Sequence, residues 1–104
     1  MDIELTRDAQ KVAAKIYKVY LHRIDGGMIK TDAKKFSEEE LTALLSDEQS
    51  QDFNEELQEL IKAFSFCTNI WDDITLSNTF IIYMENRFKN GMKEVLGFLS
   101  QFIP

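Results

Sequence analysis

The sequence predicts a mainly α-helical protein with one small β-hairpin, an α+β fold, and three observations lead to this prediction. Apolar residues recur at helical spacing along most of the 104-residue chain. The segment 65–76 is instead rich in β-branched and aromatic residues around the turn dipeptide Asp72-Asp73. The length suits one core, so we expect a single domain over residues 1–104.

The first predicted helix begins after Thr6 or Asp8 and runs to about Ile24, where Asp25-Gly26-Gly27 stops it. One side of this helix is apolar. The opposite side is basic, as expected for either a solvated face or a surface that contacts an acidic partner such as nucleic acid. The basic residues are Arg7, Lys11, Lys15, Lys18 and His22.

A helix-turn-helix is predicted in the middle of the chain. Ser37 followed by Glu40 matches a capping box, which indicates a short helix from Glu38 to about Leu45. The polar connector 46–50 has about the length that joins the two helices of such a motif. The second helix begins near Gln51 and ends near Phe64.

Short strands are predicted on both sides of this motif. Met28-Ile29 would form the first strand of a small sheet, and 65–76 would form the hairpin. Ser77 or Asn78 then caps a helix that ends before Lys89-Asn90-Gly91.

The last predicted helix, at about 92–103, is apolar on most of its circumference. Such a helix needs cover on more than one side. Both an intramolecular core and a homodimer interface would provide that cover. The candidate dimer interface consists of Val95, Leu96, Leu99 and Phe102.

Acidic residues are concentrated in the helix-turn-helix. The chain has a net charge of −6, and residues 36–61 contain nine carboxylates and no lysine or arginine. Such a block is either a solvated face or an acidic surface for a basic partner. The candidate partner surface, on one side of the second helix, consists of Asp52, Glu55, Glu56 and Glu59.

The order helix, short strand, helix, helix, hairpin, helix resembles the winged helix-turn-helix superfamily over roughly residues 6–89. The run from Ile74 to Glu85 is similar to the last wing strand and closing helix of small bacterial regulators, where a Leu-Thr-x-x-Gly-x-x-Tyr-Leu pattern is common. Thr79 or Phe80 stands where glycine is usual. The extra C-terminal helix after Asn90 resembles the dimerisation helices of MarR- and PadR-type proteins.

The resemblance implies that the second helix of the motif enters the major groove of DNA and that the wing contacts the backbone or minor groove. On that mapping Asn54, Gln58 and Lys62 are candidate DNA contacts. The charge opposes this, because no Lys or Arg lies between Lys62 and Arg87 and carboxylates are repelled by phosphates. Additional contacts to DNA phosphates would have to come from the first helix, through Arg7, Lys11, Lys15 and Lys18.

No enzyme chemistry is indicated. The one His and the one Cys are 45 residues apart, and neither a metal-ligand cluster nor a glycine-rich phosphate loop occurs. We therefore expect no catalytic residues, metal or cofactor. No apolar run reaches the roughly 18 residues that a membrane helix needs, so we expect a cytoplasmic protein without a membrane partner.

Three functions follow from these observations. The first is a small winged-helix regulatory protein, similar to a transcriptional regulator, with weak or no direct DNA binding and with homodimer formation through the last helix. The second is a protein-interaction or nucleic-acid-mimicking module that uses its acidic surface. The third is a small-ligand sensor with an apolar site lined by Trp71, Phe80 and Tyr83.

Overall fold

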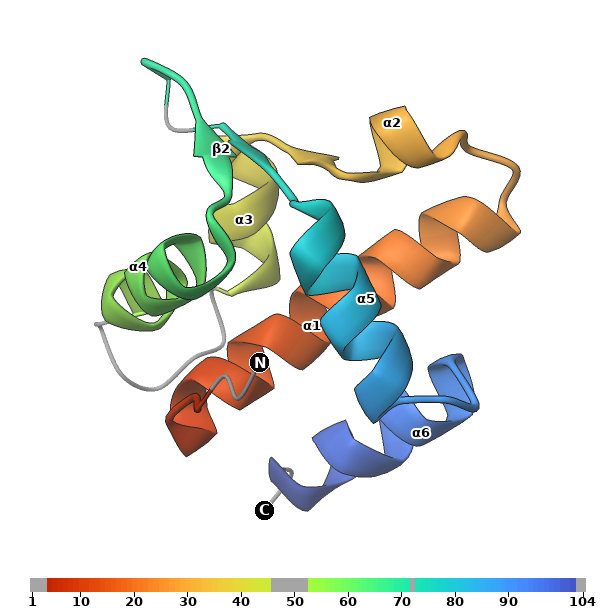
Figure 1. Ribbon diagram of the computed structural model, residues 1–104. Helices are drawn as coiled ribbons and strands as arrows, with labels where there is room; N and C mark the ends of the chain where they lie inside the picture. The colour runs from red at the N-terminus through yellow and green to blue at the C-terminus, as the bar shows by residue number, and fades with distance from the viewer. Residues whose placement is uncertain (1–3, 46–52, 72, 103–104) are drawn as a thin grey trace.

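The computed structural model describes residues 4–45, 53–71 and 73–102. Within these ranges the protein has six α-helices and a three-stranded antiparallel sheet, with 69% of the residues in helices (Figure 1). The predicted α+β class is therefore confirmed. The elements are α1 (Arg7–Asp25), α2 (Lys30–Ala33), β1 (Lys35–Phe36), α3 (Glu38–Leu44), α4 (Phe53–Phe64), β2 (Cys67–Thr68), β3 (Ile74–Thr75), α5 (Asn78–Arg87), α6 (Met92–Leu99) and the 3-10 helix η1 (Ser100–Phe102).

Helix α1 is the central element, and α2, α4, α5 and α6 all contact it (Figure 1). It begins where the sequence predicts, because the Thr6 hydroxyl accepts a hydrogen bond from the Ala9 amide at 3.2 Å. It ends at Gly26, and Gly27 has the left-handed φ of 93° that reverses the chain. The predicted bounds of this helix are confirmed.

The predicted strand at Met28-Ile29 is wrong. Both side chains are exposed, and the Ile29 carbonyl accepts hydrogen bonds from Asp32 and Ala33 at the start of α2. The first strand lies further along the chain, at β1, where Phe36 is buried and Lys35 is exposed. A strand forms here because one of its two side chains, Phe36, reaches the core, whereas Ile29 faces outward.

The two helices of the predicted helix-turn-helix are both present as α3 and α4. The capping box at Ser37 and Glu40 is confirmed, with each side chain accepting a hydrogen bond from the other residue's amide. The predicted connector 46–50 and the predicted start near Gln51 lie outside the described residues. The inward-facing side chains are Leu41 and Leu45 on the α3 side and Leu57, Leu60 and Phe64 on α4.

The sheet has the strand order β1-β3-β2, and each strand is two residues long. Ile74 is opposite Phe36 on one side and Thr68 on the other. The hairpin strands are shorter than predicted because Asn69 starts a turn. Its side-chain oxygen accepts hydrogen bonds from the amides of Trp71 at 2.9 Å and Asp73 at 3.1 Å. Residues 69–71 are therefore turn, not strand.

The C-terminal helices largely follow the prediction. The Ser77 hydroxyl accepts a hydrogen bond from the Phe80 amide at 3.1 Å, and α5 starts there. Gly91, with φ of 67°, turns the chain into α6. The predicted last helix at 92–103 is shorter, since α6 ends at Leu99 and η1 continues to Phe102. Residue 103 lies outside the described ranges.

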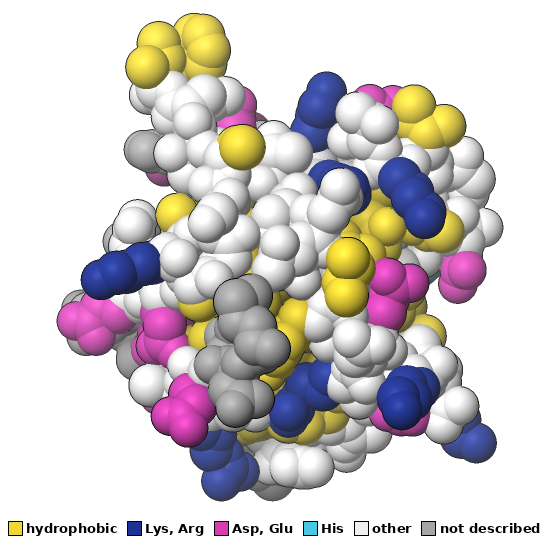
Figure 2. Space-filling model, in the orientation of Figure 1, with side chains coloured by type: hydrophobic (Ala, Val, Ile, Leu, Met, Phe, Trp, Pro, Cys, Tyr) yellow, Lys and Arg dark blue, Asp and Glu magenta, His cyan; other side chains and the backbone are white. Residues whose placement is uncertain are grey.

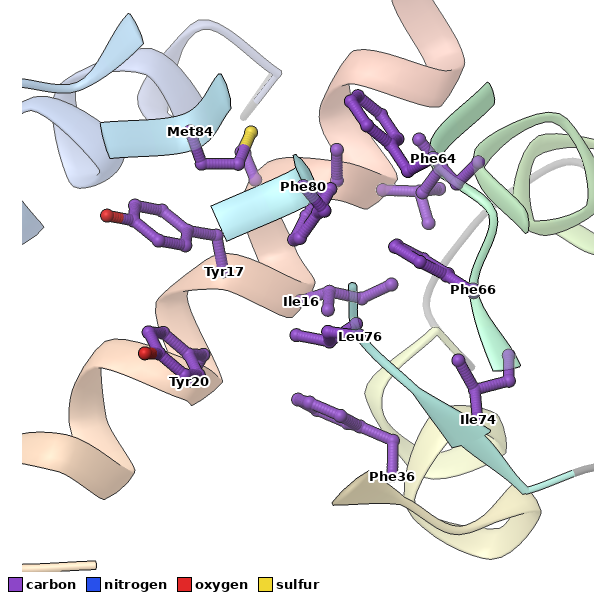
Figure 3. Packing of buried hydrophobic residues seen from close by; sticks show 14 of the residues in the cluster. Ile16, Tyr17, Tyr20, Phe36, Phe64, Phe66, Ile74, Leu76, Phe80 and Met84 are labelled. Atoms are coloured by element: carbon purple, nitrogen blue, oxygen red, sulfur yellow. The ribbon is translucent and has the colours of Figure 1, made fainter. Parts of the chain in front are cut away.

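The core lies between α1, α4, α5 and the sheet (Figure 3). Phe80 packs edge-on against Phe64 and Phe66, with ring centroids 5.1 Å apart in both pairs. No helix in the part of the chain that the structure describes has both the length and the hydropathy to cross a membrane.

Candidate functional site

The exposed face of α4 is the first candidate site. Glu55, Gln58 and Lys62 are exposed at helical spacing, opposite the buried face of the helix. Figure 2 shows carboxylates gathered over this side of the molecule with a basic side chain beside them. Of the predicted DNA contacts on this helix, Gln58 and Lys62 therefore share one face with Glu55. The side chain of Asn54 lies outside the described residues.

Glu59, a member of the predicted acidic surface, is partly buried and has a partner on another helix. Its carboxylate accepts hydrogen bonds from the Thr6 amide at 2.9 Å and from the Thr6 hydroxyl at 3.0 Å. This contact joins α4 to the start of α1. The helical wheel correctly placed Glu59 away from the apolar face of α4, but the side chain meets another helix there. Glu59 therefore has a structural partner within the chain.

The other three residues of the predicted acidic surface differ in their exposure to solvent. Glu56 is half-buried, and its Oε2 has no hydrogen-bond partner among the described residues. Asp52 lies outside those residues. Glu55 is the exposed member of the predicted set, and the α3 N-terminus adds two further exposed carboxylates, Glu38 and Glu39. Exposed carboxylates are thus present at the start of α3 as well as on α4.

The basic face of α1 is partly covered by the C-terminal segment. The Arg7 guanidinium lies 5.1 Å from the centre of the Phe102 ring, and the Lys11 ammonium lies 5.3 Å from it. Lys15 is half-buried and Lys18 is exposed. The structure therefore brings Arg7 and Lys11 together, but around an aromatic ring. These candidate DNA contacts are on α1 beside η1, whereas Gln58 and Lys62 are on α4.

The candidate dimer interface needs a correction at Val95, which is buried in the core and is not available to a partner. Leu99 is half-buried against that core. Phe102 is half-buried beside Arg7 and Lys11. Leu96 is 47% exposed and is the most open of the four. One chain thus provides much of the cover that the apolar C-terminal helix requires.

The hairpin tip is an exposed apolar feature that sequence reasoning missed. Ile70 is 85% and Trp71 is 69% exposed. Of the residues that the sequence suggested for an apolar ligand site, Trp71 is exposed at the tip, whereas Phe80 is fully buried in the core. The signal in the sequence was Asn69, because an Asn side chain that caps the backbone two residues ahead turns the chain outward.

We compared the chain with known protein families, curated proteins and solved structures. No protein-family model, curated protein or solved structure matches this chain.

Proposed function

We propose that this chain is a winged helix-turn-helix regulatory protein, in which α3 and α4 form the helix-turn-helix and the β2–β3 hairpin is the wing. The observation that carries the proposal is the order of the elements. The helix α1 precedes β1, α3 and α4 follow, the hairpin comes next, and α5 closes the order, with the short α2 inserted before β1. Helix α6 is then an addition after the winged-helix unit.

The partner in this proposal is a basic protein surface and not DNA. Affinity for DNA depends largely on Lys and Arg contacts to phosphates. The exposed face of α4 has one base, Lys62, on the same side as Glu55, and the start of α3 has the exposed carboxylates Glu38 and Glu39. The wing segment between Lys62 and Arg87 contains no base. A cationic partner suits these surfaces better than a polyanion does.

The test is a pair of titrations at low salt. In an electrophoretic titration against mixed-sequence duplex DNA, the wild-type protein should cause no retardation. In a calorimetric titration with decalysine, Glu55→Lys and Glu39→Lys should each weaken binding more than Glu85→Lys, which makes the same charge change at an exposed position of α5.

Glu56 and Glu59 are unsuitable for this comparison. Glu59 binds Thr6 and Glu56 is half-buried, so reversing either charge would also disturb the fold. If the protein retards DNA, and its affinity for DNA decreases as the salt concentration rises, then DNA and not a basic protein would be the partner. Equal weakening by all three lysine variants would show that net charge, and not the acidic surface of α3 and α4, determines the binding.

A further inference from the structure

One side chain of the hairpin is bound to the start of α3. The Asp73 carboxylate accepts a hydrogen bond from the Glu38 amide at 3.2 Å through one oxygen. Its other oxygen accepts the side-chain amide of Asn69 at 3.2 Å, and the Asn69 oxygen in turn accepts the backbone amide of Asp73 at 3.1 Å. Asp73 is therefore part of the turn and also connects the β2–β3 hairpin to α3, which lies beside it (Figure 1).

A second carboxylate connects the start of α3 to α1. Glu40 accepts a hydrogen bond from the Ser37 amide at 3.2 Å through one oxygen and pairs with Arg23 of α1 through the other. Both Glu40 and Asp73 thus place negative charge near the first amides of α3, where the helix dipole favours it. The first turn of α3 is held by α1 through Glu40 and by the hairpin through Asp73.

The carboxylates at this junction are of two kinds. Those of Glu40 and Asp73 are bound within the fold. Those of Glu38 and Glu39 are exposed and make no hydrogen bond or ion pair with the residues that the structure describes. Because Asp73 binds the backbone amide of Glu38, it fixes the part of the chain from which these two exposed side chains project.

We infer that Asp73 is a positioning residue for the surface that binds the basic partner, an inference that rests on the function proposed above. By holding the hairpin on α3, Asp73 keeps Glu38 and Glu39 in one orientation before the partner binds. A surface that is already ordered loses less conformational entropy on binding, so its affinity is higher. Asp73 acts through the Glu38 backbone and is itself half-buried.

Two substitutions of Asp73 separate its positioning role from its charge. Asp73→Asn and Asp73→Ala remove the same negative charge, but asparagine retains an oxygen that can accept the Glu38 amide. In the calorimetric titration with decalysine at low salt, Asp73→Ala should bind at least about threefold more weakly than Asp73→Asn, because its surface must be ordered on binding. Hydrogen exchange of the Glu38 amide should also be faster in Asp73→Ala than in Asp73→Asn.

Ser77→Ala is the control for a general loss of stability, because it removes the cap of α5 and leaves Asp73 and α3 unchanged. It should lower the free energy of unfolding and still bind decalysine as tightly as the wild type. Equal decalysine affinity of the two Asp73 variants would overturn the inference, even if their Glu38 amides exchange at different rates, because Asp73 would then support only the fold. Failure of the function proposed above gives a different result, since the wild type itself would then not bind decalysine.

Discussion

The carboxylate of Glu59 accepts both hydrogen bonds that Thr6 donates, from the amide at 2.9 Å and from the hydroxyl at 3.0 Å. The same hydroxyl oxygen accepts the Ala9 amide and so caps α1. Thr6 therefore has two structural roles. It provides a hydrogen-bond acceptor for an otherwise unpaired amide at the start of α1, and it connects α1 to α4 through Glu59. The negative charge of Glu59 also lies at the N-terminus of α1, where the helix dipole favours it.

We predict that Thr6→Ala and Glu59→Ala each lower the free energy of unfolding by about 1 kcal/mol, the usual cost of a lost cap or hydrogen bond. The double variant should lose less than the sum of the two, because one interaction is removed twice. Urea denaturation of the four proteins measures this coupling. Glu55→Ala, at an exposed position of the same helix, should change stability by less than about 0.5 kcal/mol. Strict additivity would contradict the prediction.

Arg23 joins three elements of the fold. Its Nη1 donates to the carbonyls of Ala33 at 3.2 Å and Lys35 at 2.7 Å, and its Nη2 pairs with Glu40. The guanidinium also lies 4.3 Å from the centre of the Phe36 ring. A planar group with several donors suits this position, which a lysine cannot fill in the same way.

We predict that Arg23→Lys lowers the free energy of unfolding by about 1–2 kcal/mol, because at least one backbone carbonyl loses its partner. Lys18→Ala, at an exposed position of the same helix, should leave stability within about 0.5 kcal/mol. Thermal and urea unfolding measure both variants. An Arg23→Lys protein as stable as the wild type would show that the guanidinium does not hold the α1–β1–α3 junction.

Helix starts were predictable from the sequence because caps are local. Ser37, Ser77 and Thr6 each bond to an amide three residues ahead, so the signal and its partner lie within one turn. The buried face of α4 was predictable for the same reason, since its apolar spacing is a property of one helix.

The errors arose where a distant contact decides the outcome. The contact between Glu59 and Thr6 could not be predicted either, because the two residues are 53 positions apart in the chain. The contacts of Arg23 had no signal in the sequence, because two of its acceptors are backbone carbonyls, which any sequence possesses, and its side-chain partner Glu40 is 17 residues away. Ile29 and Trp71 have strand-forming or core-forming side chains, yet both are outside the core, because Ile29 precedes α2 as its N-cap residue and Trp71 lies in the turn that Asn69 starts.

Two glycines should respond to alanine in opposite directions. Gly91 has a φ of 67°, which is costly for a residue with a Cβ, and so Gly91→Ala should lower stability by about 1 kcal/mol or more. Gly97 is inside α6 with no left-handed φ and open space around its position. Gly97→Ala should therefore raise stability by about 0.5–1 kcal/mol through its helix propensity. Denaturation midpoints that shift the same way for both would count against this distinction.

We predict that the free energy of unfolding decreases at high pH because of the Tyr17 phenol. Burial, and secondarily the charges of Glu85 and Tyr20, raise the pKa of the Tyr17 phenol from 10.0 to about 12. The folded state thus keeps a proton that the unfolded state releases above pH 10.0. Stability from this group is complete below the unfolded pKa and is lost as the pH rises towards about 12.

The urea midpoint of the wild type should therefore decrease more steeply with pH in this range than that of Tyr17→Phe, which has no phenol to ionise. The comparison is needed because lysines titrate in the same range in both proteins. Burial and Glu85 also raise the pKa of the Tyr20 phenol, so some slope should persist in Tyr17→Phe and decrease again in the double variant with Tyr20→Phe. Parallel pH profiles for wild type and Tyr17→Phe would mean that the folded protein releases the Tyr17 proton as readily as the unfolded chain.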